Sequence, residues 1–317
     1  MAEDIKVSVL TATYNHENYI RHTIESVIAQ KTNFKFELII GDDCSTDKTG
    51  EIVREYADKY PDIIVPIIRE KNVGMAMNTM DLMAKSKGEY IAFVEGDDYW
   101  IDANKLQKQV DFLESHRDYV AVFGTCIMVD ENENRLENYE KYNGFMKAAG
   151  DYTVKDFETY LLPGQTATAM YRKGSYGMLQ KKLQETKIDP RMMIDRTQVL
   201  CMLAVGKMYN LGENLAAYRY VLNAASGSWS SKNDFYNVEN TINYLEGMKV
   251  MENIAKALDL DLNFDKRRLY EWDKLYSATE QLPDEGKKAV KEKIKSDFNN
   301  KSELFIFRLK RFLGKGK

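Results

Sequence analysis

The stretch GEYIAFVEGDDYW, residues 88–100, indicates both the fold and a candidate site. Its first half contains the apolar run Tyr90–Val94, typical of a buried strand, which runs into the acidic turn Glu95–Asp98. A pair of carboxylates at a strand end suits a hard divalent cation. The alternative is that Asp97 and Asp98 cap the helix predicted near Lys105, and this stretch alone leaves both interpretations open.

Three strand–helix units precede this stretch. Their apolar runs predict strands, and their helical periodicity predicts amphipathic helices between those strands. The predicted strands are Val7–Leu10, Phe36–Ile40 and Ile63–Ile68, and the predicted helices are Tyr19–Gln30, Thr49–Tyr60 and Met75–Ser86. Strands that alternate with helices predict an α/β fold whose sheet is mainly parallel and flanked by helices on both faces.

Polar residues follow three of these four strands. They are Thr13–Asn15 after the first, Asp42–Asp43 after the second and Glu95–Asp98 after the fourth. The carboxyl ends of parallel strands meet at one edge of the sheet, where ligands bind in such folds. We therefore expect these three clusters to lie together.

The rest of the chain continues the α/β pattern and then becomes helical. A helix is predicted over Lys105–Ser115 and another over Arg196–Gly206, and strands are predicted over Tyr119–Val129, Thr166–Tyr171 and Leu215–Val221. From about Asn233 the pattern is mainly helical. This predicts a binding and catalytic domain over residues 1–228 and a helical region over residues 229–317.

The charge balance and the absence of certain motifs argue against several classes of protein. The 317 residues include 45 Lys and Arg against 49 Asp and Glu, which argues against a protein that coats nucleic acid. The chain has no G-x-G-x-x-G after its first strand and no P-loop, so dehydrogenases and P-loop NTPases are poor candidates. Three separated cysteines, the absence of a secretory pattern at the start and the absence of an apolar run of about 20 residues predict a cytoplasmic protein.

The last seventeen residues are basic and amphipathic. Six Lys or Arg residues stand there against the single acid Glu303, with Leu and Phe interleaved. Such a tail can lie on an anionic membrane surface, which makes the protein a candidate for peripheral attachment to the inner face of the cell membrane. A terminal helix that packs its apolar face on the body is the alternative.

Four segments together resemble the GT-A glycosyltransferases of family 2. They are VSVLTATYN (residues 7–15), IIGDDCSTD (residues 39–47), NVG (residues 72–74) and the stretch at 88–100. Glu95–Trp100 and KLQKQ (residues 105–109) resemble a branch that assembles bacterial polysaccharides. The resemblance implies a GT-A, Rossmann-like fold that transfers a sugar from a UDP-sugar to a glycan acceptor with inversion, and a lipid-linked oligosaccharide of capsule, exopolysaccharide or O-antigen synthesis is the expected acceptor.

The resemblance assigns the nucleotide pocket to the first half. Thr13 and Tyr14 would line the uracil site, Asp43 would accept a hydrogen bond from the base N3–H, and Gly74 belongs to the same donor-binding set. The plain structural alternatives are a core aromatic for Tyr14 and a turn or cap residue for Asp43.

The resemblance assigns the metal site to the acidic turn. Asp98 would coordinate Mn²⁺ or Mg²⁺, Asp97 would lie near the ribose or donor sugar and share in the metal site, and Glu95 stands where many relatives have Asp. The cation would neutralise charge on the diphosphate leaving group.

Two residues further along complete the implied site. Asp195, at the start of a predicted helix, matches the general base that deprotonates the acceptor hydroxyl, with Asp189 in reserve; an ordinary N-cap also explains Asp195. Arg219 resembles the Arg of a Y-R pair that reaches the diphosphate. The three histidines have no metal-ligand spacing, and the sequence assigns them no role.

Two departures from the family pattern keep other functions open. Met77 lies in a neighbourhood where many members carry an Arg, and Val221 stands where relatives often carry His. A non-catalytic protein that binds a nucleotide sugar is therefore one alternative. A nucleotidyltransferase that makes sugar nucleotides is another, although Thr11–Asn15 lacks the glycines of its signature loop.

Overall fold

The structure, a computed structural model, describes residues 4–137, 146–186, 195–221, 238–278 and 284–297, together with residues 305, 306 and 309. The chain divides into two compact units. One holds residues 1–157 and 161–222, and the other holds residues 158–160 and 223–317. The boundary predicted between residues 228 and 229 falls outside the described residues.

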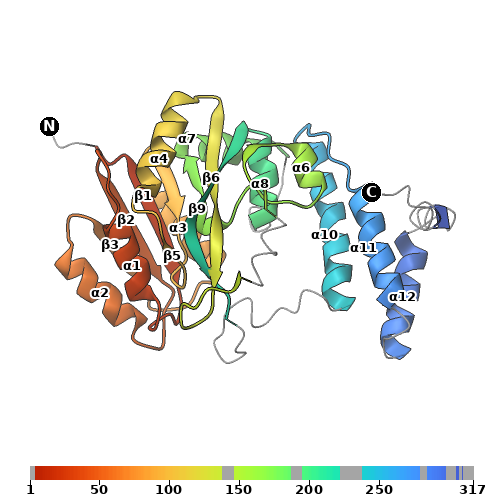
Figure 1. Ribbon diagram of the computed structural model, residues 1–317, viewed down its shortest axis with the longest axis horizontal. Coiled ribbons are helices and arrows are strands. Elements are labelled where there is room, and N and C mark those ends of the chain that lie inside the picture. Colours follow the sequence, from red (N-terminus) through yellow and green to blue (C-terminus); the bar gives the residue numbers. More distant parts are fainter. Residues whose placement is uncertain are drawn as a thin grey trace. The chain divides into compact units, whose positions relative to one another are not determined.

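A nine-stranded sheet forms the centre of the first unit (Figure 1). Its strands are β1 (Val7–Thr13), β2 (Phe36–Asp42), β3 (Ile64–Ile68), β4 (Tyr90–Phe93), β5 (Tyr99–Trp100), β6 (Tyr119–Val129), β7 (Gly150–Tyr152), β8 (Met170–Arg172) and β9 (Lys207–Arg219). The order is β3-β2-β1-β4-β8-β6-β9-β5, with β7 paired to β9. The predicted α/β class is confirmed.

Strand direction differs between the two halves of the sheet. The pairs β1–β2, β2–β3 and β1–β4 are parallel, as the sequence predicts. In the second half β6 and β9 are parallel, but β8 runs antiparallel to β4 and β6, and β5 and β7 run antiparallel to β9. The apolar runs of the second half could not predict this, because they report burial and carry no information about direction.

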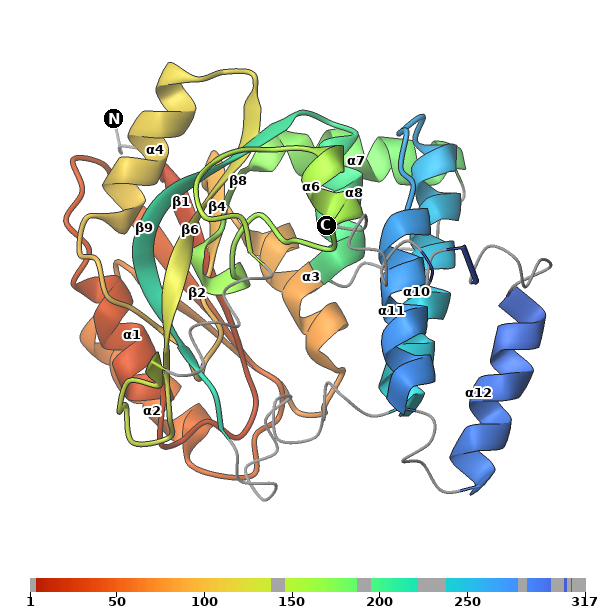
Figure 2. The same ribbon diagram turned by 45° about the vertical axis from the view of Figure 1, so that its right-hand side comes forward.

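Helices cover both faces of the parallel half. Alternate strand residues such as Val9 and Leu38 share a core with α1 (Ile20–Ile28), α2 (Thr49–Lys59) and α4 (Lys105–Ser115). The opposite face meets α3 (Met75–Lys85), whose Leu82 is fully buried, and Figure 2 shows α3 across the sheet from α1 and α2. The shorter helices α6 (Val154–Glu158) and α8 (Asp195–Leu203) and the longer α7 (Lys173–Thr186) complete the unit.

The prediction of a strand over Thr166–Tyr171 is only partly right. A 3₁₀ turn occupies Thr166–Thr168, and the strand β8 begins only at Met170. The Gln165 side chain accepts from the Ala167 N–H, and the Trp100 indole donates to the Ala167 carbonyl at 2.8 Å. The backbone groups of Ala167 therefore bond to side chains and not to a neighbouring strand. The apolar pattern carries no information about such bonds, and it therefore predicted a strand that is too long.

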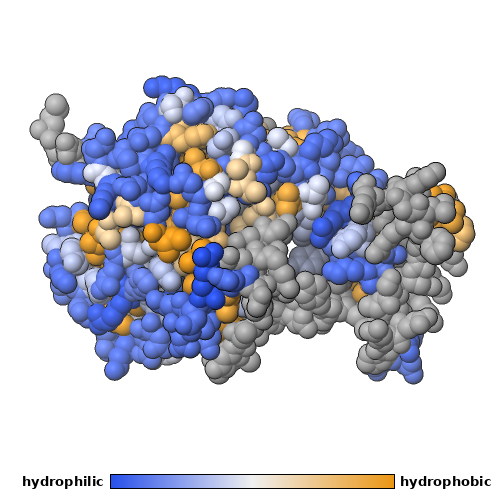
Figure 3. All heavy atoms as spheres, viewed as in Figure 1, coloured by the Kyte–Doolittle hydropathy of each residue, from blue (hydrophilic) through white to orange (hydrophobic). Residues whose placement is uncertain are grey.

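The second unit is helical in its described part. It contains α10 (Val238–Ala257), α11 (Asp265–Ala278) and α12 (Asp284–Asp297), with Leu245, Trp272 and Val290 in one buried cluster. Across the described parts of both units, no helix combines the length and apolarity needed to cross a membrane. Mainly hydrophilic residues cover the face in Figure 3, with small apolar patches between them.

Candidate functional site

The loops after β1 and β2 are bonded to each other. The Asn15 side chain accepts from the Thr46 N–H at 2.8 Å, and the His16 N–H donates to Thr49 Oγ1 at 2.8 Å. Asn15 holds a φ of +58°, a left-handed conformation that asparagine tolerates. The two loops therefore form one wall, from which the Tyr14 side chain stands 44% exposed while Thr13 is buried.

Asp43 is buried where β2 ends, and backbone donors meet it. Its Oδ1 accepts from the Val73 N–H and its Oδ2 from the Gly74 N–H, each at 2.8 Å. The Arg69 Nε lies 3.9 Å from Oδ1. Gly74 has φ +84° and ψ 156°, a conformation open almost only to glycine, and it immediately precedes α3. The carboxylate of Asp43 thus fixes the loop 72–74, and each oxygen keeps a second lone pair for a ligand donor.

Asp97 and Asp98 occupy the turn between β4 and β5. Asp98 is buried, and its Oδ1 accepts from the Arg219 backbone N–H at 2.8 Å while its Oδ2 accepts from Gln165 Nε2 at 3.3 Å. The Thr23 hydroxyl on α1 donates to the Asp98 carbonyl at 2.7 Å, which anchors the turn to the helix below. The Asp97 side chain is 22% exposed, so it is the more accessible of the two carboxylates.

Burial raises the pKa of Asp98 well above its ordinary value, and the negative charges of Asp97 and Glu95 raise it further. Burial and the same three carboxylates also raise the pKa of Tyr218. A low-dielectric site with several carboxylates favours either a proton or a cation. Carboxylates with perturbed pKa values cluster at functional sites, which makes this turn a candidate site.

The acidic turn fits a cation that takes few protein ligands. Among the described residues, no group of three or more His, Cys, Asp or Glu side chains is arranged to hold a metal ion by itself. Two adjacent aspartates, one buried with a raised pKa, match the donor set of Mg²⁺ or Mn²⁺, which completes its coordination with water and substrate phosphates.

Sheet order brings Arg219 to this turn. β9 lies between β6 and β5, with Ala217 opposite Tyr99 and Arg219 itself opposite Val129. Its guanidinium is buried and its Nε donates to the Asp97 carbonyl at 2.8 Å. It stacks over the Tyr19 ring, 4.4 Å from the ring centroid. The predicted contact of Arg219 with a diphosphate stays a prediction, since the guanidinium here holds the acidic turn.

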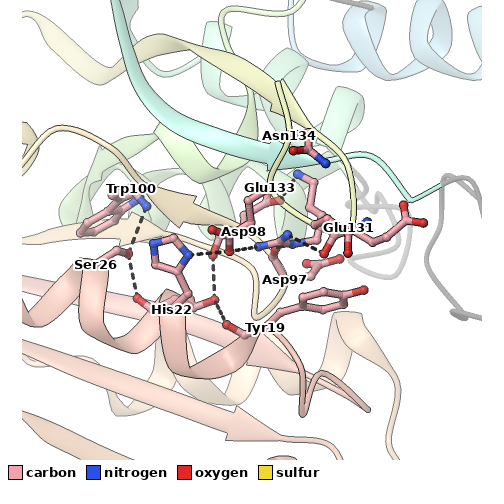
Figure 4. Close-up of polar contacts among 12 residues, drawn as sticks. Tyr19, His22, Ser26, Asp97, Asp98, Trp100, Glu131, Glu133 and Asn134 are labelled. Atoms are coloured by element: carbon pink, nitrogen blue, oxygen red, sulfur yellow. Dashed lines mark hydrogen bonds and ion pairs between the residues drawn. The ribbon is translucent and has the colours of Figure 1, made fainter. Parts of the chain in front are cut away.

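The turn after β6 also contacts the Arg219 guanidinium, and Figure 4 shows Glu131 and Glu133 of this turn near Asp97 and Asp98. The carbonyls of Asp130 and Glu131 accept from Nη1 at 3.2 and 3.4 Å, and the Glu133 carboxylate accepts from Nη2 at 3.0 Å. Glu133 also pairs with His22 Nδ1 at 2.7 Å. Burial alone raises the pKa of Glu133, but the bonds from His22 and Arg219 outweigh it and leave that pKa lowered.

Sequence reasoning missed several residues of this site. His16 lies with Nε2 3.9 Å from Asp97 Oδ2, His22 pairs with Glu133, and Gln165 reaches Asp98. His16 directly follows Thr13–Asn15, so its position in the sequence could have indicated it. His22, Glu133 and Gln165 carry no local signal, because long-range folding alone brings them to the acidic turn.

The predicted base is only partly described. Asp195 is the first residue of α8, as predicted, but its side chain lies outside the described residues. The same holds for Asp189 and the whole segment 187–194. The role of Asp195 stays a prediction.

The fold and the acidic strand ends define a class: an α/β protein of GT-A type with a ligand site at the carboxyl edge of its sheet. The model of the family "Glycosyl transferase family 2" matches residues 8–176. The chain is also 30% identical over 245 residues to the putative teichuronic acid biosynthesis glycosyltransferase TuaG of Bacillus subtilis, covering 77% of this chain and 90% of TuaG. The chain therefore belongs to glycosyl transferase family 2.

Two other comparisons are either shorter or less similar in sequence. An uncharacterized protein of Mycobacterium bovis is 44% identical over 126 residues, which is 40% of this chain and 36% of that relative. The crystal structure of S. aureus TarS 1–349 in complex with UDP-GlcNAc has the same fold, with a TM-score of 0.62, 19% identity and coverage of 92% of this chain and 80% of that one.

Proposed function

We propose that the protein is a metal-dependent, inverting glycosyltransferase that moves a sugar from a UDP-sugar to a glycan acceptor. One observation carries the proposal: Asp98 is buried beside two further carboxylates at the sheet edge where ligands bind in this fold. Family membership supports the reaction class, and the similarity to a UDP-GlcNAc complex supports a uridine donor.

The nucleotide belongs to the first half of the site. Thr13 and Tyr14 line the base pocket in this proposal, with the exposed Tyr14 ring offering a stacking surface. Asp43 accepts from the base N3–H with the lone pairs that Val73 and Gly74 leave. Gly74 permits the positive φ that this loop adopts directly before α3.

The metal belongs to the acidic turn. Asp98 and Asp97 would hold Mn²⁺ or Mg²⁺, with Glu95 beside them, and the bound cation would neutralise charge on the departing diphosphate. The raised pKa of Asp98 supports this assignment, because a cation relieves the repulsion among the three carboxylates.

The transfer itself needs a base. The acceptor oxygen attacks the anomeric carbon, the bond from that carbon to the diphosphate oxygen breaks, and the acceptor proton passes to a carboxylate. Asp195 is the candidate base, at the start of α8. Such a base contributes about 10²–10⁴-fold to the rate.

The proposed acceptor rests on the similarity to TuaG and on the basic tail at the C-terminus. TuaG is named for teichuronic acid biosynthesis, which supports a polysaccharide acceptor, and a lipid-linked oligosaccharide fits a membrane-bound tail. Of that tail the structure describes Phe305, Ile306 and Leu309, all exposed. Residues 1–228 would then act as the catalytic domain and residues 229–317 as a helical region that places it at the membrane.

Removing residues 302–317 should abolish sedimentation with anionic liposomes, and retained sedimentation would count against this role.

The donor half is tested by thermal unfolding with UDP, GDP, CDP, dTDP and ADP, each with and without Mn²⁺. A ligand at 100 times its dissociation constant adds about 2.7 kcal/mol of stability. We expect UDP with Mn²⁺ to raise the melting temperature of the wild type strongly. In Asp98→Asn, adding Mn²⁺ should not raise the melting temperature beyond the value with UDP alone. Asp111→Asn removes one charge from the exposed side of α4 and is the matched control. No shift with any nucleotide in wild type would reject the proposal.

A further inference from the structure

The guanidinium of Arg219 is a structural support in this site. Its side chain is only 1% exposed, and its three guanidinium nitrogens donate four hydrogen bonds to protein acceptors. A fifth hydrogen bond comes from its backbone, whose N–H donates to the Asp98 carboxylate, so two of the five bonds reach the acidic turn. One residue thus holds the carbonyl of Asp97 and the carboxylate of Asp98 together.

The turn that holds Arg219 is itself fixed by Asp130. Its Oδ1 accepts from the N–H groups of Asn132 and Asn134, each at 2.8 Å, and its Oδ2 accepts from the Asn134 side chain at 3.0 Å. Glu133 has a φ of +67°, a left-handed conformation that costs free energy for a glutamate. Strain of this kind persists where the surroundings over-determine it, as the Asp130 bonds do here.

The Glu133 carboxylate joins three elements that surround the acidic turn. It accepts from Arg219 at the end of β9 and pairs with His22 on α1, and Figure 4 shows Glu133 and His22 beside Asp98. The His22 ring stacks on Tyr99 of β5 with centroids 3.8 Å apart. Tyr99 follows Asp98 directly, so both sides of the acidic turn are linked to the same carboxylate.

We infer that Glu133 is a positioning residue for the Asp97–Asp98 turn, acting through Arg219. The inference rests on the proposed function, since it takes the two aspartates as the site of a metal–nucleotide complex. Glu133 fixes the guanidinium, the guanidinium fixes the Asp97 carbonyl, and the two carboxylates are thereby held in place before a cation arrives. Outer partners that orient metal ligands change metal affinity by about 10–100-fold when they are lost.

The test compares Glu133→Gln with Glu131→Gln. Both variants remove one negative charge from the same turn, but Glu131 meets Arg219 through its backbone carbonyl, which the substitution retains. Mn²⁺ is titrated in the presence of UDP and followed by electron paramagnetic resonance. We expect Glu133→Gln to weaken Mn²⁺ binding about tenfold, Glu131→Gln to stay within about twofold of wild type, and metal-free UDP binding to change in neither.

Equal Mn²⁺ affinities in the two variants would overturn the positioning role. Absence of Mn²⁺–UDP binding in the wild type would instead reject the proposed function, and the positioning role with it. Thermal unfolding without ligand shows whether each variant is folded, and Glu133 is 42% exposed, so folding should survive. If Glu133 acts through Arg219, adding Glu133→Gln to Arg219→Lys should cost less than the sum of the two single changes, and full additivity would contradict the inference.

Discussion

Asp43 and Asp98 follow strands on either side of β1 and are almost equally buried, yet their surroundings are opposite. Asp43 receives two backbone N–H groups and has Arg69 nearby. Asp98 receives one backbone N–H and one side-chain amide, and two further carboxylates lie close to it. The difference teaches that burial alone does not define a role: hydrogen-bond donors surround the first carboxylate, whereas the second lies among like charges that raise its pKa and favour either a proton or a cation.

The two aspartates also differ in how the chain builds their surroundings. The bonds of Asp43 reach loop 72–74, about thirty residues further along the chain. The bond from Arg219 to Asp98 spans 121 residues and depends on the position of β9 in the sheet. The surroundings of Asp43 are therefore built from neighbouring strand–helix units, whereas those of Asp98 are assembled by the topology of the whole sheet.

The largest effect should come from Asp98→Asn. The substitution replaces the buried carboxylate by an amide and so removes the proposed cation site. We expect the rate at which UDP is released from the donor to fall by about 10³-fold. Metal-free UDP binding, which depends on the Asp43 half, should be unchanged. A rate close to wild type would place the essential carboxylate elsewhere.

Asp43→Asn should lower the free energy of unfolding, whereas Asp98→Asn should not. An amide nitrogen cannot accept from the Val73 or Gly74 N–H, so the loop loses a charge-assisted bond and one of its donors stays buried. We expect a loss of about 3 kcal/mol in the free energy of unfolding, measured by urea denaturation. Wild-type stability in this variant would contradict the view that Asp43 fixes the loop.

Gly74→Ala tests the same loop through its backbone. No atom lies within 4 Å of an added Cβ, so any cost comes from the positive φ rather than from a clash. We expect a loss of about 2 kcal/mol of unfolding free energy. Ala76→Gly on α3 is a control for general flexibility at that helix, and its cost should be about 1 kcal/mol or less.

Tyr14→Ala should separate binding from folding. The side chain is exposed, so unfolding should change little, while UDP affinity should fall about fivefold through lost aromatic contact, roughly 1 kcal/mol. Isothermal titration against UDP and urea denaturation measure the two effects. Equal losses in both would mean that Tyr14 packs as a core residue.

The dependence of stability on pH provides a further test of Asp98. The pKa of Asp98 is raised in the folded state, so its contribution to stability is fully present below the unfolded value, about 3.8, and is lost as pH rises through the raised value. Metal-free wild type should therefore lose stability relative to Asp98→Asn as pH increases towards neutrality. Mn²⁺ with UDP should remove that difference. Parallel melting-temperature curves for the two proteins would contradict the raised pKa.

The sequence predicted the strands of the parallel half well. Val7–Leu10, Phe36–Ile40 and Tyr90–Val94 are apolar runs long enough to predict strands, and the polar residues after them lie where such strands end. The Thr166–Tyr171 prediction was only partly right, because side-chain bonds from Gln165 and Trp100 favour a 3₁₀ turn there. Antiparallel pairing of β5 and β8 had no signal in the apolar pattern.

By itself, the sequence determined the alternation of strands and helices from β1 to β4, the acidic turn at Asp97–Asp98 and the family, because periodicity and residue type are local properties. Only the tertiary structure decided that Arg219 would hold this turn and that Glu133 and His22 would support Arg219. Those contacts depend on the placement of β9 between β6 and β5. The pairing partners of a strand are selected by the packing of the whole sheet, so residues more than a hundred positions apart meet without any local pattern to announce it.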